Sequence, residues 1–321
     1  MNLFRRISIF LTIIILGLWL NNSSLFADTS ANETRIIAHR GVHQTYAGTD
    51  LDRQACTASP VHPVSHEFIE NTIPSMRAAF GYGADVVELD VHLTKDNIFA
   101  VFHDWTLDCR TNGKGVTHEQ SWAMVKNLDI GYNYSVDGKT FPLRGKAIGL
   151  MPNLTDILAE DFPGQLLINF KSNRATEGHE MAKRLTEEPY SVKIWGIYGG
   201  ARPTKIATEN SDITGFTTSG FKTCMIDYLL FSWSGYVPES CRNTVVAIPQ
   251  NYSALVWGFP HRFTQRMRNH GTKVILIGPY DGSAHTRGVD TPEMLAKVPS
   301  NFDGYIWTNK IEVVGPLVER P

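Results

Sequence analysis

Polar side chains that could do chemistry follow short apolar runs of the chain, where strands would end. His39 and Arg40 follow one such run, and His103 and Asp104 follow another. Two imidazoles can serve as a base and an acid in proton transfer. An arginine can hold a phosphate group through its planar guanidinium. These residue types could therefore transfer protons beside a bound phosphate group.

Two further apolar runs carry polar residues at alternate positions. Glu88 and Asp90 are spaced i, i+2, and Asn169 and Lys171 have the same spacing. In a strand this spacing puts both side chains on one face. Charged residues rarely point into a core unless they are paired or bind metal. The two carboxylates suit a hard cation such as Mg²⁺ or Ca²⁺, and Lys171 could join Arg40 in holding a phosphate.

The other histidines and one tryptophan have weaker signals. His92 lies in the same run as the two carboxylates, and we expect it to face away from them. His43, His62 and His66 lie in one loop and could form a second metal site, although a soluble polar loop explains them equally well. Trp105 follows the second histidine pair closely and either lines a pocket or packs under a loop.

The elements that must position these residues alternate between strands and helices. Continuous apolar runs between helices are typical of parallel strands covered on both faces. Repeated βα units over about 285 residues predict a closed (β/α)₈ barrel. A doubly wound open sheet is the alternative, but the chain has no glycine-rich phosphate loop to support it. Active sites of such barrels form at the C-terminal ends of the strands, so the polar residues should converge there.

The boundaries of these elements follow from the apolar patterns. Strands are expected at 36–38, 85–93, 98–102, 166–170, 194–198, 214–217, 245–248, 274–277 and 304–307, and helices at 71–82, 118–126, 154–159, 177–187 and 253–269. A long insertion, residues 42–69, separates the first strand from the first helix. Loops of this length are usually functional or disordered, and in a barrel this one would lie at the active-site end.

The N-terminus resembles an export signal. Two arginines precede Ile7–Leu20, a run of 14 uncharged residues. This run is short for a membrane span of about 20 residues and fits a secretory signal better. Cleavage after Ala27 would leave a barrel at 35–318, although Leu25 is not the small residue that such sites prefer. The alternative is an uncleaved anchor, so the protein is expected to be periplasmic or secreted, or anchored to a membrane by residues 7–20.

The four cysteines agree with export. An even number in an exported chain indicates disulfides, and four cysteines allow three pairings. We favour Cys224–Cys241, which closes a short local loop and leaves Cys56–Cys109; four free buried thiols are the alternative. The composition, 42% apolar and 19% charged, is that of a globular protein. A formal net charge of −2 gives no basic excess for binding nucleic acid.

Taken in order, several motifs resemble those of the glycerophosphodiester phosphodiesterase family. They are Ala38-His39-Arg40-Gly41, Glu70-Asn71-Thr72, Val87-Glu88-Leu89-Asp90-Val91, Phe102-His103-Asp104, Thr111-Asn112-Gly113-Lys114-Gly115 and Trp307-Thr308-Asn309. The His-Arg-Gly motif alone is weak, but the ordered set is specific. The resemblance covers about residues 35 to 315 and is clearest before residue 130.

The resemblance implies a (β/α)₈ barrel that hydrolyses glycerophosphodiesters to glycerol 3-phosphate and an alcohol with a divalent metal, Ca²⁺ or Mg²⁺. It implies a role for each matching residue: His39 and His103 in catalysis, Glu88, Asp90 and Asn169 at the metal, Arg40 and Lys171 at the substrate phosphate, and Glu70 at the rim of the site. Trp105 and Trp307 are further candidates for the rim. The expected partner is therefore a small glycerophosphodiester, with membrane proximity through the N-terminus.

Two departures from the family bear on this interpretation. Asn169 stands where the family has a glutamate as its third metal ligand, which removes one negative charge and should weaken metal binding. The insertion at 42–69 replaces a few residues in the family, and a Cys56–Cys109 disulfide would hold it over the site. The alternatives are a phospholipase D-like enzyme on lipid phosphodiesters and a catalytically weakened barrel that only binds phosphodiesters.

Overall fold

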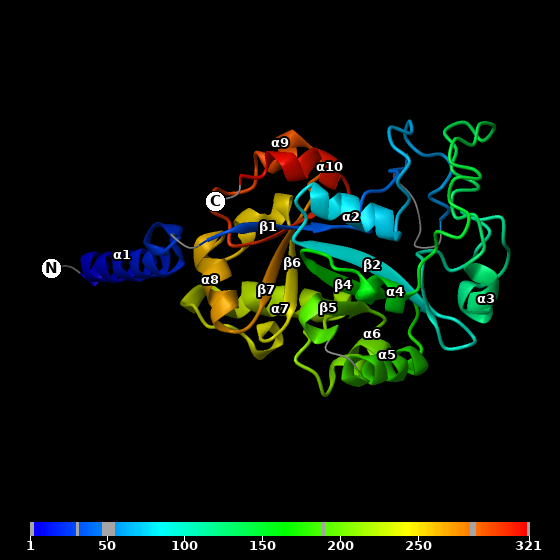
Figure 1. The fold of residues 1–321 in the computed structure, drawn as a ribbon. Helices are drawn as coiled ribbons and strands as arrows, with labels where there is room; N and C mark the ends of the chain where they lie inside the picture. The colour runs from blue at the N-terminus through cyan, green and yellow to red at the C-terminus, as the bar shows by residue number, and fades with distance from the viewer. Residues whose placement is uncertain (1–2, 30–31, 47–54, 188–189, 283–286, 320–321) are drawn as a thin grey trace.

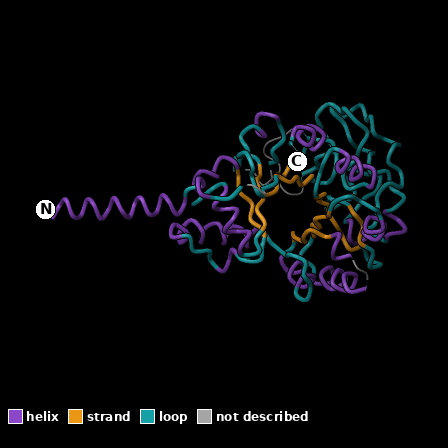
Figure 2. Tube along the Cα trace, turned by 60° about the vertical axis from the view of Figure 1, so that its left-hand side comes forward, coloured by secondary structure: helices purple, strands orange, loops and turns teal. Residues whose placement is uncertain are grey.

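One curled sheet lies at the centre of the molecule, with helices around it (Figures 1 and 2). The computed structural model describes residues 3–29, 32–46, 55–187, 190–282 and 287–319. Within them, the sheet order is β5-β4-β2-β1-β8-β7-β6, with β3 paired to β2 outside this path. The strands are β1 (Thr34–Ala38), β2 (Val86–Leu93), β3 (Phe99–Val101), β4 (Gln165–Phe170), β5 (Ile194–Gly199), β6 (Val245–Pro249), β7 (Lys273–Ile277) and β8 (Gly304–Thr308).

The helices cover the outside of the sheet, except for the first, which projects from it. They are α1 (Leu3–Asn22), α2 (Ile73–Gly81), α3 (Trp122–Val125), α4 (Leu154–Ala159), α5 (Ala175–Glu187), α6 (Ala201–Thr208), α7 (Thr218–Phe231), α8 (His261–Asn269), α9 (Pro292–Leu295) and α10 (Ile311–Val314). Every pairing on the main path is parallel. The fold is therefore an α/β barrel, as the sequence predicts.

One expected barrel strand is almost absent. In place of a strand at 214–217, the structure has a single parallel bridge between Ile197 and Gly215. A Cβ atom at Gly215 would lie 2.4 Å from Thr208 Oγ1, so the backbone here packs closely against the end of α6. Without a side chain to pack, a glycine weakens a strand. Within the described residues, this bridge stands in for a full strand between β5 and β6.

The strand predicted at 98–102 is present, but it is not one of the parallel strands of the barrel. It forms β3, which runs antiparallel to β2 with Val91 opposite Val101, instead of joining the parallel barrel. A tight turn joins them, with Thr94 and Ile98 bonded to each other and Asn97 at φ 60°. His39 and His103 therefore do not end neighbouring strands. Instead, the hairpin returns the chain to Asp90, whose carbonyl accepts from Phe102 N at 3.0 Å.

Two expected helices are interrupted. The pattern at 118–126 gives a 3₁₀ turn, Thr117–Glu119, followed by the short α3, and the pattern at 253–269 gives a 3₁₀ helix, Gln250–Leu255, followed by α8. In the second case Pro260 directly precedes α8, and a proline cannot continue a helix from the preceding turn.

The insertion and the cysteines behave largely as expected. The described parts of residues 42–69 contain no regular strand or helix, only a bridge between Tyr46 and Val61, and residues 47–54 lie outside the described part. Both favoured disulfides are present, Cys56–Cys109 and Cys224–Cys241. The first joins the insertion to the segment that follows His103.

The direction of the strands defines two ends of the barrel. The chain enters β1 from the side of α1 and runs away from it, so the N-terminal ends of the parallel strands lie toward α1 (Figure 1). The C-terminal ends lie at the opposite end, together with the insertion. Between the ends, a buried cluster that includes Ile37, Leu167, Trp195 and Ile275 fills the interior.

Candidate active site

A sharp turn after β1 separates His39 from Arg40. Arg40 has φ 58° and Gly41 has φ 79°, both in the left-handed region. A Cβ atom at Gly41 would lie 2.3 Å from Ser75 Oγ, so only glycine fits there. The Ser75 hydroxyl lies 3.2 Å from the carbonyl of Arg40 and 2.7 Å from that of Val42. Strained backbone of this kind persists where neighbouring groups fix it, and here it orients two candidate residues.

The imidazole of His39 is held by a chain of two residues from the end of the barrel. Its Nδ1 donates to Asn309 Oδ1 at 2.6 Å. Asn309 in turn donates to Asp290 from its side-chain nitrogen at 2.9 Å and its backbone nitrogen at 2.6 Å. Because the carboxylate of Asp290 can only accept, the amide oxygen of Asn309 must face His39. Neutral His39 therefore carries its proton on Nδ1, and Nε2 is left with a free lone pair.

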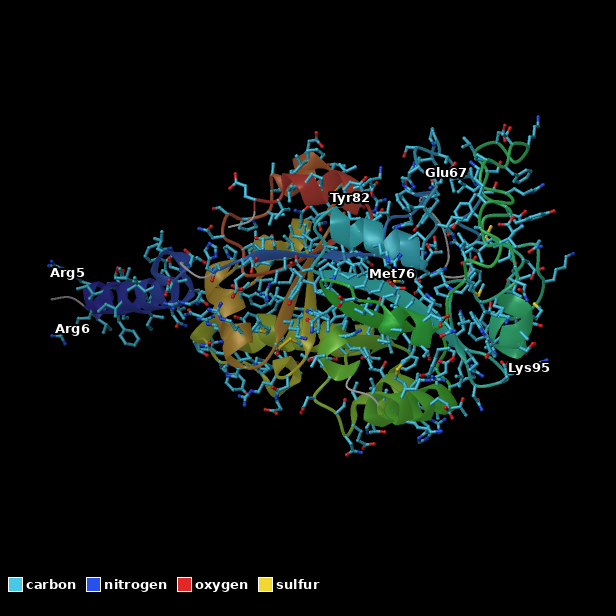
Figure 3. The ribbon with its side chains drawn as sticks, in the orientation of Figure 1. Arg5, Arg6, Glu67, Met76, Tyr82 and Lys95 are labelled. Atoms are coloured by element: carbon cyan, nitrogen blue, oxygen red, sulfur yellow. A yellow bond between two sulfur atoms is a disulfide. The ribbon has the colours of Figure 1, made fainter. Side chains whose placement is uncertain are left out.

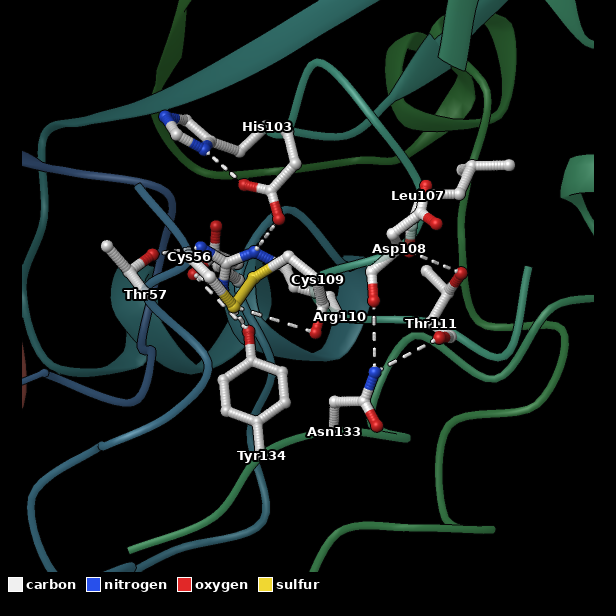
Figure 4. The surroundings of a disulfide bond; sticks show 12 residues. Cys56, Thr57, His103, Leu107, Asp108, Cys109, Arg110, Thr111, Asn133 and Tyr134 are labelled. Atoms are coloured by element: carbon white, nitrogen blue, oxygen red, sulfur yellow. Dashed lines mark hydrogen bonds and ion pairs between the residues drawn. A yellow bond between two sulfur atoms is a disulfide. The ribbon is translucent and has the colours of Figure 1, made fainter. Parts of the chain in front are cut away.

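The imidazole of His103 has a carboxylate partner instead of an amide. Its Nδ1 lies 2.6 Å from Asp104 Oδ1, and Arg110 Nε donates to Asp104 Oδ2 at 2.9 Å. Arg110 is only 1% exposed and follows the disulfide partner Cys109 directly (Figure 4). Asp104 thus orients His103 in the same way as Asn309 orients His39, with Nε2 facing away from the partner.

A continuous chain of ion pairs links this group to the turn after β1. Arg110 donates to Glu70 Oε2 at 2.8 Å and to the hydroxyl of Tyr134 at 2.6 Å. Arg40 donates to Glu70 Oε1 at 3.0 Å, and its Nε lies 3.2 Å from Asp90 Oδ2. All four charged groups are at most 9% exposed. Glu70, expected at the rim, therefore lies between two buried guanidinium groups.

Asp90 lies at the centre of the positive charges. Asn71 and Asn169 each donate to it from their amide nitrogens, at 3.0 and 2.9 Å, and Lys171 Nζ lies 3.4 Å away. Burial opposes ionisation of Asp90, but Lys171 and Arg40 hold its pKa well below the ordinary value. Asp90 is therefore a carboxylate at neutral pH.

Glu88 is in the opposite electrostatic situation. It is fully buried, and burial together with the charge of Asp90 raises its pKa to about 8. The Tyr198 hydroxyl donates to Glu88 Oε1 at 2.7 Å. Within the described residues Glu88 Oε2 has no hydrogen-bond partner, although His39 Nε2 lies 3.8 Å away. A buried oxygen without a partner is costly, so Glu88 is suited to a group that is added to the site.

Both histidines are neutral in this environment. Burial lowers the pKa of His39 and of His103 well below the ordinary value, and Arg40 lowers it further in each case. An anionic phosphate placed against Arg40 would remove part of this effect.

The donor set fits a divalent cation through two residues. Glu88 Oε2 lacks a partner and Asp90 shares its strand face, so these two carboxylates could hold a cation. Asn169 presents its amide nitrogen to Asp90, and its oxygen lies against Gly199. In this arrangement Asn169 is a hydrogen-bond donor to Asp90. The described residues contain no group of three or more His, Cys, Asp or Glu placed to hold a metal.

The remaining predicted residues are more scattered. Trp307 is 6% exposed, its ring centroid is 5.0 Å from that of His39, and its Nε1 has no hydrogen-bond partner in the described residues. Trp105 is 37% exposed and packs edge-on against His118. A second metal site is not formed among the described residues: His43 contacts a backbone carbonyl, His62 contacts Thr45, and His66 contacts Gln44.

The expectation for His92 was wrong. Residues 88, 90 and 92 share the parity of one strand, so His92 lies on the same face as the carboxylates. It is fully buried, its Nε2 lies 3.4 Å from the carbonyl of His103, and burial lowers its pKa to about 4. His92 therefore lies beneath the His103 backbone as a neutral side chain.

The structure also adds residues that the sequence analysis missed. Tyr198 ends β5 and could have been found by the strand-end criterion that selected the others. Asp290 and Arg110 lie outside every strand, and a single sequence gives no signal for them. Asn309 was noted only as part of a motif.

Comparison with known proteins agrees with this architecture. The sequence matches the glycerophosphoryl diester phosphodiesterase family over residues 39–274. A glycerophosphodiester phosphodiesterase of Caldanaerobacter subterraneus is 45% identical over 65 residues, which are 20% of this chain and 27% of the relative. The chain thus aligns with only about a quarter of that protein.

Solved structures share the fold at low sequence identity. The phosphodiesterase domain of a Mycobacterium tuberculosis protein has a TM-score of 0.63 and 15% identity, covering 90% of this chain and 100% of that domain. An Oleispira antarctica phosphodiesterase in complex with the product sn-glycerol-3-phosphate has a TM-score of 0.52 and 16% identity, covering 89% and 100%.

The parallel strands form an α/β barrel, and histidines, carboxylates and basic groups cluster at its C-terminal end. The match over most of the chain is more specific. The protein belongs to the glycerophosphoryl diester phosphodiesterase family.

Proposed function

We propose that the protein hydrolyses glycerophosphodiesters to glycerol 3-phosphate and an alcohol. The observation that carries this proposal is the pair of imidazoles, His39 and His103, each with Nδ1 fixed and Nε2 free, beside Arg40 and Lys171. Two such groups can move two protons in one displacement at phosphorus. The product complex of the Oleispira antarctica relative supports the same substrate class.

Arg40 and Lys171 would bind the phosphate. Arg40 lies 3.2 Å from Asp90 through its Nε, and the ammonium of Lys171 belongs to a side chain that is 21% exposed and lies 3.4 Å from the same carboxylate. An anion bound above Asp90 would therefore meet two positive charges. In the transition state negative charge builds on the phosphoryl oxygens, and these two fixed positive charges would stabilise it.

The partners of the two histidines suggest their roles. His39 is bonded to a neutral amide, so its neutral form is favoured and Nε2 can accept a proton from the nucleophile, either water or the glycerol hydroxyl of the substrate. His103 is bonded to a carboxylate, which favours its protonated form once the phosphate is bound. As the nucleophile forms a bond to phosphorus and the ester bond to the leaving alcohol breaks, His103 Nε2 would donate a proton to the alcohol oxygen.

A divalent cation would be held by Glu88 and Asp90. When bound, Ca²⁺ or Mg²⁺ would polarise the phosphoryl group as a Lewis acid. Asn169 would join them only if its amide turned over, at the expense of its hydrogen bond to Asp90.

The activity is tested with the purified full chain on glycerophosphocholine, a lysophospholipid and an intact phospholipid, each with EDTA and with added Mg²⁺ or Ca²⁺. We expect hydrolysis of the deacylated substrate, its loss in EDTA and its recovery with metal. Preference for intact lipid would favour the phospholipase D-like alternative, and binding without turnover would favour the weakened barrel.

Variants of the histidines test the residue assignment. His39→Ala and His103→Ala should each lower kcat at least about 100-fold while the circular dichroism spectrum is unchanged. His179→Ala is the matched control, because His179 is exposed on the outer helix α5. Wild-type activity in either of the first two variants would contradict the assignment.

A further inference from the structure

Helix α1 differs from the rest of the molecule in its surroundings. It is 20 residues long, none of its side chains is buried, and its mean hydropathy is high enough for a membrane span. It projects from the domain at the end opposite the candidate site, with Arg5 and Arg6 near its free tip (Figure 3). In water such a helix would expose a large apolar surface.

The end of α1 is bonded into the folded domain. Arg266 of α8 donates to the backbone carbonyl of Asn21 at 2.8 Å and to Asn22 Oδ1 at 2.9 Å. The Asn22 side chain also donates to the carbonyl of Trp233 at 2.8 Å. These contacts fix the C-terminal end of α1 against the segment that follows α7.

The residues after α1 complete another helix of the domain. Ser24 Oγ accepts from the backbone nitrogens of His261 and Arg262 at 3.1 and 3.4 Å, at the start of α8. The N-cap residue of α8, Pro260, has no side chain that can accept these hydrogen bonds. Cleavage after Ala27 would remove this cap and two of the three partners that Arg266 has among the described residues, leaving only the hydroxyl of Tyr228. Losing a cap alone costs about 1 kcal/mol.

An apolar surface lies beside this junction. It consists of residues at the end of α7, in and just after the 3₁₀ turn Ser232–Ser234, and in the segment before α8. The exposed fractions are 61% for Leu230, 55% for Phe231, 48% for Trp233, 53% for Tyr236 and 39% for Trp257. Trp257 is tied to this group because its Nε1 donates to the carbonyl of Leu229. We call these five residues the aromatic patch.

The topology puts the aromatic patch at the N-terminal end of the barrel. Helix α7 returns from the C-terminal ends of the strands, and β6 begins shortly after the patch. The contact between Asn22 and Trp233 places the patch next to the end of α1. Tryptophan and tyrosine are the residues that favour the interface between lipid and water.

We infer that α1 is retained as a transmembrane anchor and that the aromatic patch rests on the outer surface of the same lipid bilayer. The uncharged run Ile7–Leu20 has 14 residues and spans about 21 Å, less than the roughly 30 Å of a hydrocarbon core. Such a mismatch draws the flanking groups into the interface. Arg5 and Arg6 reach back toward headgroups on one side, and the aromatic patch enters the interface on the other.

The charges give the direction of insertion. Arginines at the start of a span stay on the cytoplasmic side, so the barrel lies outside, where its two disulfides are stable. The candidate site then opens away from the bilayer, because the parallel strands run away from α1. This inference does not depend on the proposed activity.

The anchor is tested by expressing the full chain in an exporting bacterium and measuring the mass of the protein extracted from membranes. We expect an intact N-terminus and retention in the membrane after an alkaline carbonate wash. A chain that begins after Ala27 and is released by the wash would overturn the inference.

The patch is tested by tryptophan fluorescence of the full chain in bilayers that contain brominated phosphatidylcholine, which quenches nearby indoles. Trp233→Phe should remove part of the quenched emission, and Tyr236→Trp should add quenched emission. The matched control is Trp105→Phe. Trp105 is similarly exposed, at 37%, but it follows His103 closely in the chain and so lies near the candidate site, away from the bilayer. Equal quenching in wild type, Trp233→Phe and Trp105→Phe, with no quenched addition from Tyr236→Trp, would overturn contact with lipid.

Discussion

Asp290 contacts no candidate catalytic residue, yet it should determine which nitrogen of His39 is protonated. Its carboxylate accepts two hydrogen bonds from Asn309, at 2.6 and 2.9 Å, and so orients the Asn309 amide. In Asp290→Asn, the new amide can still accept from the backbone nitrogen of Asn309 but presents an NH₂ group to its side chain. Asn309 would then turn over and donate to His39 Nδ1. The proton of His39 would move to Nε2, which could no longer accept one.

The size of this effect follows from the hydrogen bond that is lost. A hydrogen bond to a charged group contributes about 1.5–3 kcal/mol. If that free energy holds the Asn309 amide in its present orientation, its loss lowers the productive population roughly 10- to 150-fold, at about 1.4 kcal/mol per factor of ten. We expect kcat to fall by this factor while KM changes little, because Arg40 and Lys171 are untouched.

The assay combines steady-state kinetics on a soluble glycerophosphodiester with ¹⁵N NMR of His39, whose ring shifts report the tautomer. The control is Asp303→Asn, which removes a carboxylate paired with Arg35 and Arg268 at the opposite end of the barrel. If Asp290→Asn keeps kcat within about twofold of wild type while His39→Ala is inactive, the reasoning is refuted.

Three further predictions concern other parts of the structure. Tyr198→Phe removes the donor to Glu88 Oε1 and should weaken Ca²⁺ or Mg²⁺ binding about 10-fold in a calorimetric titration; unchanged affinity would contradict this. Burial lowers the pKa of Lys273 to about 8, so from pH 8 to 10 the unfolded chain holds more protons than the folded one, and stability against urea should rise; Lys273→Met should abolish the rise. Replacing both cysteines of the Cys56–Cys109 disulfide by serine should lower the unfolding free energy by about 2–4 kcal/mol and also reduce kcat, since the loop spans 53 residues beside Arg110. The same change at Cys224–Cys241, distant from the site, should reduce stability alone.

The parallel strands and most residues of the candidate site could be predicted from the sequence because both follow local rules. Apolar runs indicate buried strands, and polar residues at their ends lie at one end of a parallel barrel. These local rules failed where the direction or the length of a strand depends on the elements that it packs against. A strand was predicted at 98–102, but its antiparallel direction follows from the tight turn after Leu93, which the apolar pattern does not indicate. Gly215 similarly reduced a predicted strand to one bridge.

Contacts between distant loops could not be predicted from the sequence. Asp290 meets Asn309, and Arg110 meets Glu70, only after the barrel has formed. The amide orientation of Asn169 depends on the charge of Asp90, which residue type alone does not specify. The wrong prediction for His92 has another cause. The alternation of side chains along a strand already puts His92 on the same face as the two carboxylates, so the sequence was sufficient.

The chain of ion pairs from Asp104 through Arg110, Glu70 and Arg40 to Asp90 also limits how this sequence can evolve. Removing one member would leave a buried charge without a partner, at a cost of about 3–5 kcal/mol, a large share of the roughly 5–15 kcal/mol that stabilises a typical domain. Substitutions here are therefore tolerated mainly in compensating pairs. Lineages can vary the outer helices one residue at a time, but this network should be inherited or lost as a block.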